Sequence, residues 1–217
     1  MTARSATQKS NETQAARWRR RKEARPSEIL EAALSVFAEK GFTAARMDDI
    51  AARAGVSKGT IYLYFPSKEA VFKALVRETV GARIGEIVGL IQKHEGPTPK
   101  LLEAALRNFG QFVSASDLVV LPKIVIAEAG NFPDLARFYR EEVIERGLSV
   151  LGGIVARGIE RGEFRPIPTE HAVRLIMAPL LIVMIWRTTF ARFDAKPYDY
   201  SGLIEEHIQT LLKGLTP

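Results

Sequence analysis

The feature of this sequence that most constrains its fold is a tight turn at Gly55 between two short segments of helical periodicity. Before the turn, Ile50, Ala51 and Ala54 share one helix face, and their small or apolar side chains let a second helix cross closely. Gly55 suits the left-handed conformation that ends a helix, where a β-carbon would clash. Ser57 then caps the next helix by accepting hydrogen bonds from its free N–H groups. The pattern predicts two helices joined by a turn of fixed geometry.

A third helix precedes this pair. Apolar residues at helical spacing predict a helix over residues 26–40, with a proline in its first turn and Gly41 at its end. The helix after the turn covers residues 58–64 and ends before Pro66. Three short helices with a tight turn between the second and third describe a helix-turn-helix. Such a unit places its last helix in the major groove of DNA.

Helical periodicity continues through the rest of the chain. The sequence lacks both sustained alternation with a period of two and the turn residues of β-hairpins. A long helix is predicted from Ser67 to near His94, followed by a loop to Pro99 that holds two prolines and a glycine. Further helices are predicted at residues 101–114, 118–129, 133–161, 169–191 and 201–213. The expected fold class is all-α.

The positive charge is confined to the start of the chain. The sequence has a net charge of +6, and residues 1–25 carry eight Lys or Arg against two Glu, which equals the whole excess. Residues 26–80 carry seven basic and seven acidic residues. We expect residues 1–25 to form a disordered basic arm that attracts DNA phosphates. The alternative is a solvated tail that contacts nothing.

Composition and motifs argue against several other classes. Cysteine is absent, so disulfides and cysteine-based zinc sites are excluded. The three histidines are scattered without metal-ligand spacing, and no nucleotide-binding or nucleophile motif is present. The opening segment lacks the apolar core of a signal peptide, and the most apolar run, residues 175–186, is too short to span a bilayer. We therefore expect a cytoplasmic protein without a metal, a cofactor, catalytic residues or a membrane.

Residues 41–72 resemble the signature of the TetR family of transcriptional regulators. The matching positions are Gly41, Phe42, Ile50, Ala51, Ala54, Gly55, Val56, Ser57, Gly59, Thr60, Tyr62, Tyr64, Phe65, Ser67, Lys68 and Glu69. With the first helix, the match spans about 45 residues and concerns an ordered set of positions. One position departs, because Ala45 stands where the family usually has a threonine that caps a helix or meets a phosphate.

The resemblance implies which residues contact DNA. Lys58, Gly59 and Thr60 would face base edges, and Arg46 would bind the phosphate that Ala45 is unable to bind. Either tyrosine of the last helix has packing as its alternative role. The full DNA-binding set predicted is Arg46, Met47, Ser57, Lys58, Gly59, Thr60, Tyr62, Tyr64 and Lys68.

Beyond residue 80 the chain resembles the family only in layout. This layout implies a helical bundle that binds a small molecule, followed by two long helices, 169–191 and 201–213, that pair with a second copy. Residues 128–135 resemble a linker of AcrR-like regulators within the family. The apolar run in the first long helix fits a homodimer interface, and a core helix of one subunit is the alternative.

Aromatic and aliphatic side chains of the bundle are candidates for the ligand pocket. Ordinary core packing is the alternative for each of them. An apolar or weakly polar effector would suit such a pocket. The predicted set is Phe109, Phe112, Val113, Ile124, Phe138, Met177, Leu181 and Trp186.

We therefore expect a homodimeric regulator that binds double-stranded operator DNA and responds to a small-molecule effector. It would repress from a palindromic operator and leave it when the effector binds. The expected division is a basic arm at residues 1–25, a DNA-binding domain at 26–72 and a ligand-binding and dimerisation domain at 73–217. The alternatives are a sequence-independent DNA-binding protein that uses the arm, an activator of the same fold, and an enzyme or carrier built on a helical bundle.

Overall fold

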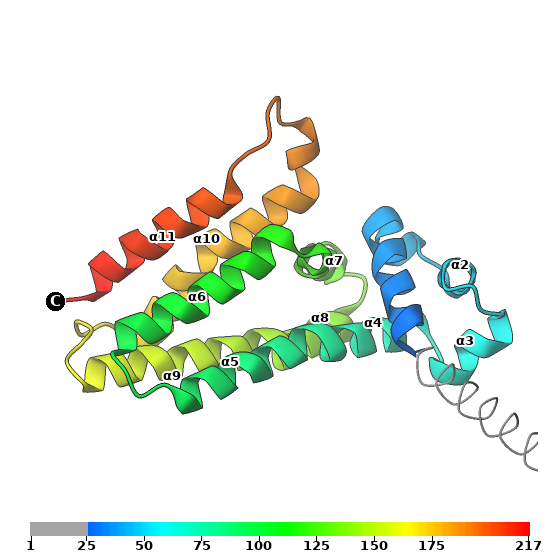
Figure 1. Cartoon of the computed structure of the whole chain (residues 1–217). Helices are drawn as coiled ribbons and strands as arrows, with labels where there is room; N and C mark the ends of the chain where they lie inside the picture. Colours follow the sequence, from blue (N-terminus) through cyan, green and yellow to red (C-terminus); the bar gives the residue numbers. More distant parts are fainter. Residues whose placement is uncertain (1–25) are drawn as a thin grey trace, which may run out of the picture. The chain divides into compact units, whose positions relative to one another are not determined.

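The chain divides into two helical units. The computed structural model describes residues 26–217, and the division falls after Leu75, so that the second unit runs from Val76 to Pro217 (Figure 1). Throughout the described residues the regular elements are helices, with no strand among them. The predicted all-α class, with an N-terminal helix-turn-helix and a C-terminal helical domain, is confirmed.

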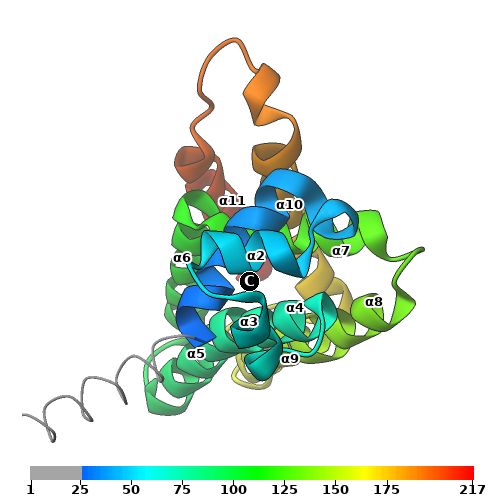
Figure 2. The same cartoon turned by 90° about the vertical axis from the view of Figure 1, so that its right-hand side faces the viewer.

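From residue 26 onward, the first unit holds four helices. They are a helix over residues 26–44, α2 (Met47–Arg53), α3 (Lys58–Tyr64) and α4 (Lys68–Val76), whose last residue already belongs to the second unit (Figure 2). The helix predicted to end at residue 40 is longer than expected. Gly41 does adopt the left-handed conformation, at φ 73°, but the chain stays helical through residue 44.

Three phenylalanines form the centre of this unit's core. Phe37, Phe42 and Phe72 lie with ring centroids 5.4, 5.6 and 5.9 Å apart, in tilted and edge-on arrangements that suit the quadrupoles of the rings. Ile50 of α2 and Ile61 of α3 are fully buried. Because Ile61 is the one buried residue of α3, the opposite face of that short helix is left for solvent or a partner.

The second unit contains the remaining helices. A π-helical turn, η1 (Arg77–Gly81), continues α4 into α5 (Ala82–Lys93), and η3 (Arg140–Glu145) likewise joins α8 (Pro133–Tyr139) to α9 (Arg146–Glu160). The other elements are α6 (Thr98–Ala115), η2 (Asp117–Val119), α7 (Val120–Glu128), α10 (Thr169–Thr189), η4 (Ala191–Phe193) and α11 (Tyr200–Leu215).

Helix α6 lies between α9 and α11, and α10 packs on α9 and α7 (Figure 1). Two glycines allow close packing in this unit. A β-carbon at Gly158 of α9 would overlap the ring of Phe164, and one at Gly110 of α6 would lie 2.6 Å from Ile204. The packing is therefore tight between α6 and α11, and where the chain leaves α9.

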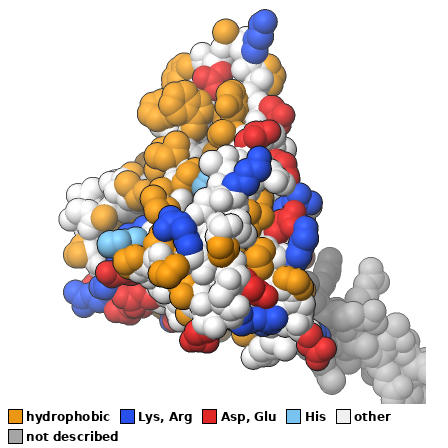
Figure 3. Space-filling model, turned by 90° about the vertical axis from the view of Figure 1, so that its left-hand side faces the viewer, with side chains coloured by type: hydrophobic (Ala, Val, Ile, Leu, Met, Phe, Trp, Pro, Cys, Tyr) orange, Lys and Arg blue, Asp and Glu red, His pale blue; other side chains and the backbone are white. Residues whose placement is uncertain are grey.

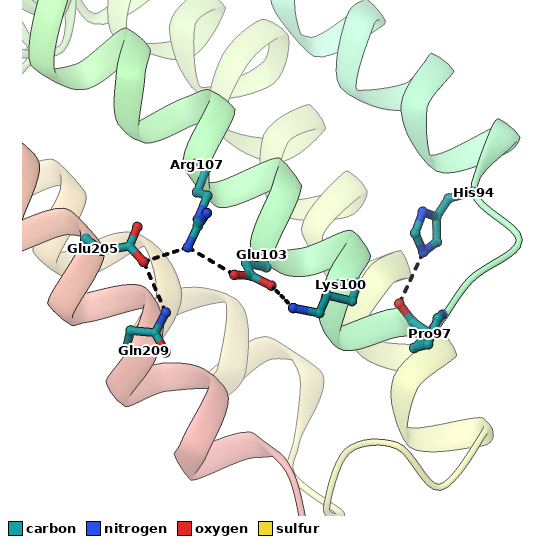
Figure 4. A network of polar contacts seen from close by, with 7 residues as sticks. All are labelled: His94, Pro97, Lys100, Glu103, Arg107, Glu205 and Gln209. Carbon is teal, nitrogen blue, oxygen red and sulfur yellow. Dashed lines mark hydrogen bonds and ion pairs between the residues drawn. The ribbon is translucent and has the colours of Figure 1, made fainter.

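A polar network joins the outer faces of α6 and α11. Arg107 lies 3.1 Å from Glu103 on its own helix and 2.7 Å from Glu205 of α11, and Gln209 donates to the same Glu205 (Figure 4). Lys100 donates to Glu103 at 2.9 Å and is the main cause of the lowered pKa of that carboxyl. The network fixes the register of the two helices at their surface.

The predicted elements of the second unit are mostly confirmed. The helix predicted from 67 to near 94 is helical without a break to Lys93, and the one predicted over 133–161 runs from Pro133 to Glu160. The loop predicted up to Pro99 is shorter than expected. Helix α6 begins at Thr98 and includes Pro99 in its first turn. The first turn of a helix tolerates a proline because its N–H groups have no partner within the helix.

Helix α10 is longer than its apolar run. By length and composition it is able to cross a membrane, with a mean hydropathy of 1.5 over its best window, of which 33% is buried in the protein. The expectation that residues 175–186 are too short therefore applies to the run and not to the whole helix. A helix in a protein core or a subunit interface has the same composition, and Arg174 and Arg187 flank the run. The segments Thr98–Ala115 and Asp117–Glu128 meet the same criterion only as a pair bent by 87°.

Candidate nucleic-acid interface

The turn between α2 and α3 has the geometry that the sequence predicted. Gly55 lies at φ 64°, in the left-handed region, and the amide of Val56 donates to the carbonyl of Ala51 at 3.0 Å. The Ser57 hydroxyl accepts from the amide of Thr60 at 3.2 Å and lies 2.8 Å from the Thr60 hydroxyl. These bonds fix the angle between the helices from residues local to the turn.

Helix α2 is tied to the first helix by two ion pairs. Arg53 binds both oxygens of Glu39, at 2.5 and 2.7 Å, and Lys40 lies 2.8 Å from Asp49. The Arg53 hydrogen bond holds the pKa of the Glu39 carboxyl below its usual value. The pKa of Asp49 is lowered by its bond to Lys40 and by the amide of Arg46, from which it accepts at 3.1 Å. Both pairs lie at the surface, so each adds little stability alone.

Helix α3 presents one face to solvent. Ile61 is fully buried, whereas Lys58, Gly59, Tyr62 and Leu63 are exposed. The exposed face is therefore the one on which the predicted base-facing residues lie. The geometry thus brings Ser57, Lys58, Gly59, Thr60 and Tyr62 together along the start and outer side of a single short helix.

The Lys58 ammonium is paired across the motif. Its Nζ lies 3.1 Å from a carboxylate oxygen of Asp48 in α2, and both side chains are well exposed, at 68% and 60%. Asp48 is absent from the predicted set. It lies ten residues before Lys58, and their contact could not be predicted without the angle between α2 and α3. Leu63 is absent as well, although its spacing from Gly59 and Thr60 already places it on their face.

Two residues of the predicted DNA-binding set have other roles in the structure. The Lys68 ammonium, a member of the predicted DNA-binding set, donates to the carbonyls of Phe42, Thr43 and Ala45 at 2.7, 3.0 and 3.2 Å. It thereby ties α4 to the connection between the first helix and α2. The side chain of Met47 is buried against the core, while Arg46 is exposed.

The eight predicted pocket residues differ in their burial. Four are buried in the packed core, namely Phe112, Val113, Ile124 and Phe138. Three more, Phe109, Met177 and Leu181, are half-buried against that core. The eighth, Trp186, is 45% exposed, and its indole N–H donates to Asp194 beyond the end of α10.

A cavity of about 240 Å³ lies where the two π-helical turns meet. It is lined by Val76, Arg77, Gly81, Glu142 and Arg146, and by none of the predicted pocket residues. Glu142 lies 3.6 Å from Arg77 and 3.0 Å from Arg146, so its carboxylate sits between two guanidinium groups. Within residues 26–217 we find no group of His, Asp and Glu side chains suited to a metal ion.

A helix-turn-helix whose last helix exposes a lysine, a glycine and a tyrosine, followed by a separate helical unit, defines a class of DNA-binding regulator. Two family models match the chain. Residues 29–75 match the model described as bacterial regulatory proteins of the tetR family, and residues 95–195 match a tetracyclin repressor-like C-terminal domain. An uncharacterized helix-turn-helix transcriptional regulator of Bacillus subtilis, YdeS, is 30% identical over 169 residues, which is 77% of this chain and 81% of that protein. The chain belongs to the TetR family of transcriptional regulators.

Other relatives have known roles. The fatty acid metabolism regulator protein of Bacillus subtilis is 28% identical over 196 residues, covering 89% of this chain and 98% of its own. The crystal structure of the regulator FadR from Bacillus subtilis in complex with stearoyl-CoA aligns with a TM-score of 0.74 at 26% identity, over 87% of this chain and 98% of that one. The fatty acid degradation regulator FadR of Bacillus halodurans aligns with a TM-score of 0.70 at 30% identity, over 87% and 94%.

Proposed function

We propose that the protein is a repressor that binds a palindromic operator as a homodimer and leaves it when a small molecule binds the second unit. DNA binding would belong to residues 26–72, and effector binding and dimerisation to residues 73–217. The observation that carries the proposal is the exposed face of α3. Lys58, Gly59 and Tyr62 of this helix are exposed to solvent, whereas Ile61 is buried and anchors the helix in the core. The protein would act in the cytoplasm, where its DNA target lies.

Specific contact would come from few residues. The helix-turn-helix region is electrically neutral over residues 26–80, so bulk attraction to phosphates is weak there. Lys58 would donate to guanine acceptors, Gly59 would allow close approach, and Tyr62, Tyr64, Ser57 and Arg46 would bind the backbone. The predicted basic arm lies outside the described residues. In the proposal it adds affinity that is sensitive to salt.

Selection from a random pool of duplexes tests this assignment. The proposal expects an enriched palindrome whose half-sites are separated by about one helical turn, roughly 34 Å. A pool without enrichment would favour the second candidate, a sequence-independent DNA-binding protein that relies on the arm. Removal of residues 1–25 should then abolish binding, whereas for the repressor it should only lower affinity and the salt dependence.

Dimerisation would use α10 and α11. The exposed residues Leu175, Ile182 and Trp186 recur at intervals of seven and four, which puts them on one face of α10. Phe190, directly after the helix, is also exposed, and its ring lies 5.1 Å from that of Trp186. Figure 3 shows hydrophobic side chains gathered in the upper part of the face it draws, at the height of the segment from α10 to α11 in Figure 1. An exposed apolar face of this kind is typical of a subunit interface.

A charge in that face tests the interface. Ile182→Glu should give a monomer in light scattering and weaken operator binding, because one half-site alone binds weakly. Ile126→Glu, on the equally exposed Ile126 of α7, is the matched control and should remain dimeric. If Ile182→Glu stays dimeric, the interface lies elsewhere. If the protein partitions into lipid vesicles and the variant does not, α10 contacts a membrane.

For the effector, we propose a long-chain fatty acyl thioester, by similarity to the regulators of fatty acid metabolism. No residue of α5 is buried, and its apolar side chains Ile84, Ile87, Val88 and Ile91 are half-exposed. Ile87 and Ile91 pack partly against the core of the second unit, and the exposed remainder of this apolar face would contact an acyl chain. Stearoyl-CoA should release the protein from its operator at micromolar concentration, and coenzyme A alone should not. Equal effects of both would contradict an acyl ligand.

A further inference from the structure

Leu63 of the recognition helix α3 is unusually exposed. Among the large hydrophobic side chains described as exposed it has the highest exposed fraction, 76%, whereas Ile61 two positions earlier is fully buried. An isolated exposed leucine on a protein surface is ordinary. Here, however, it lies on the face of α3 that the proposed function assigns to DNA, toward the end of the helix.

The helical spacing places Leu63 beside the residues that face the bases. It follows Gly59 by four positions and Thr60 by three, so the three lie on one side of α3. Gly59 has no side chain, and a β-carbon built there meets nothing closer than the Ser57 hydroxyl at 4.0 Å. No side chain therefore projects from the helix surface at Gly59, next to Leu63. A base edge that approaches Gly59 would also contact the isobutyl group of Leu63.

The chemistry of the major groove restricts what an aliphatic side chain can recognise there. Base edges in this groove present hydrogen-bond donors and acceptors, and their one apolar group is the C5 methyl of thymine. We propose that Leu63 selects a thymine in each operator half-site by packing against that methyl group. The proposal rests on the proposed operator-binding function. It assigns sequence information to a residue that donates and accepts no hydrogen bond.

A double-mutant cycle between protein and DNA tests the contact. The operator selected from the random pool is resynthesised with deoxyuridine in place of each thymine in turn, which removes only the C5 methyl. Binding of the wild type and of Leu63→Ala is measured by fluorescence anisotropy. At one position in each half-site, deoxyuridine should weaken wild-type binding about four-fold, the factor expected for one buried methyl group. Leu63→Ala should bind the thymine and deoxyuridine operators equally.

The variant is suited to this test. Leu63 is exposed, and alanine and leucine both favour helices, so Leu63→Ala should keep the circular dichroism spectrum and thermal midpoint of the wild type. Leu90→Ala, at an exposed leucine of α5, is the matched control and should respond to deoxyuridine as the wild type does.

Two results would overturn the inference. One is wild-type affinity for every deoxyuridine operator. The other is a decrease of affinity in Leu63→Ala that is the same with thymine and deoxyuridine, which indicates contact with the sugar or the phosphate backbone. Either result leaves the repressor function intact as long as the wild type still prefers the selected operator over scrambled DNA. Without that preference, the proposed function fails together with the inference.

Discussion

Replacement of Lys68 by methionine separates structural from DNA-contacting lysines. Methionine keeps an unbranched apolar stem but removes the ammonium that donates to the carbonyls of Phe42, Thr43 and Ala45. A hydrogen bond to a charged group contributes about 1.5–3 kcal/mol, and the bonds to Phe42 and Ala45 are partly buried. Taking the lower value for these two, and nothing for the exposed third, Lys68→Met should lower the free energy of unfolding of the first unit by about 3 kcal/mol.

Hydrogen exchange in the full chain, measured at increasing denaturant concentration for peptides from residues 26–75, gives the free energy of unfolding of the first unit and therefore this decrease. Lys58→Met is the matched control. Its exposed pair with Asp48 contributes less than about 1 kcal/mol, so this variant should stay stable yet lose operator affinity. If Lys68→Met unfolds at the wild-type denaturant concentration and loses only DNA affinity and salt dependence, then Lys68 is a phosphate ligand and the structural role is refuted.

Three further results are expected. Asp48→Asn removes the charged partner of Lys58 and should raise the affinity for operator and scrambled duplexes alike by up to about five-fold in anisotropy titrations. A lower affinity would contradict the pairing. Gly158→Ala places a methyl group against the ring of Phe164 and should lower stability by about 1–3 kcal/mol in chemical denaturation; unchanged stability would contradict tight packing there. The lowered pKa values of Glu39 and Asp49 mean that their ion pairs stabilise the first unit above about pH 4.5, and that this stabilisation is lost as the pH falls through the folded-state pKa values. The thermal midpoint of Glu39→Gln should therefore fall less steeply with decreasing pH than that of the wild type.

Local sequence signals predicted the local structure well. The left-handed Gly55 and the Ser57 cap are decided by a few adjacent residues, and both occur as expected. Boundaries were less certain where two signals compete. Gly41 is left-handed without ending its helix, and Pro99 lies inside α6, since a first turn has no use for the missing N–H group.

Contacts between residues distant in the chain could not be predicted from the sequence. The partners of Lys68 lie more than twenty positions earlier in the chain, and their carbonyls converge only once α4 packs on the first helix. The indole of Trp186 finds Asp194 because the chain turns back after α10. Periodicity identified the apolar residues of the second unit, but only the packing of its helices shows how deeply each one is buried, as for Phe112 and Ile124.

The central claim is sequence-specific DNA binding that an effector reverses. It is tested most directly by anisotropy titration of the full chain with its selected operator and a scrambled duplex at physiological salt, with and without stearoyl-CoA. The account predicts operator binding at least about a thousand-fold tighter than scrambled binding, and disappearance of that preference when stearoyl-CoA is present. Equal affinity for the two duplexes would contradict the account.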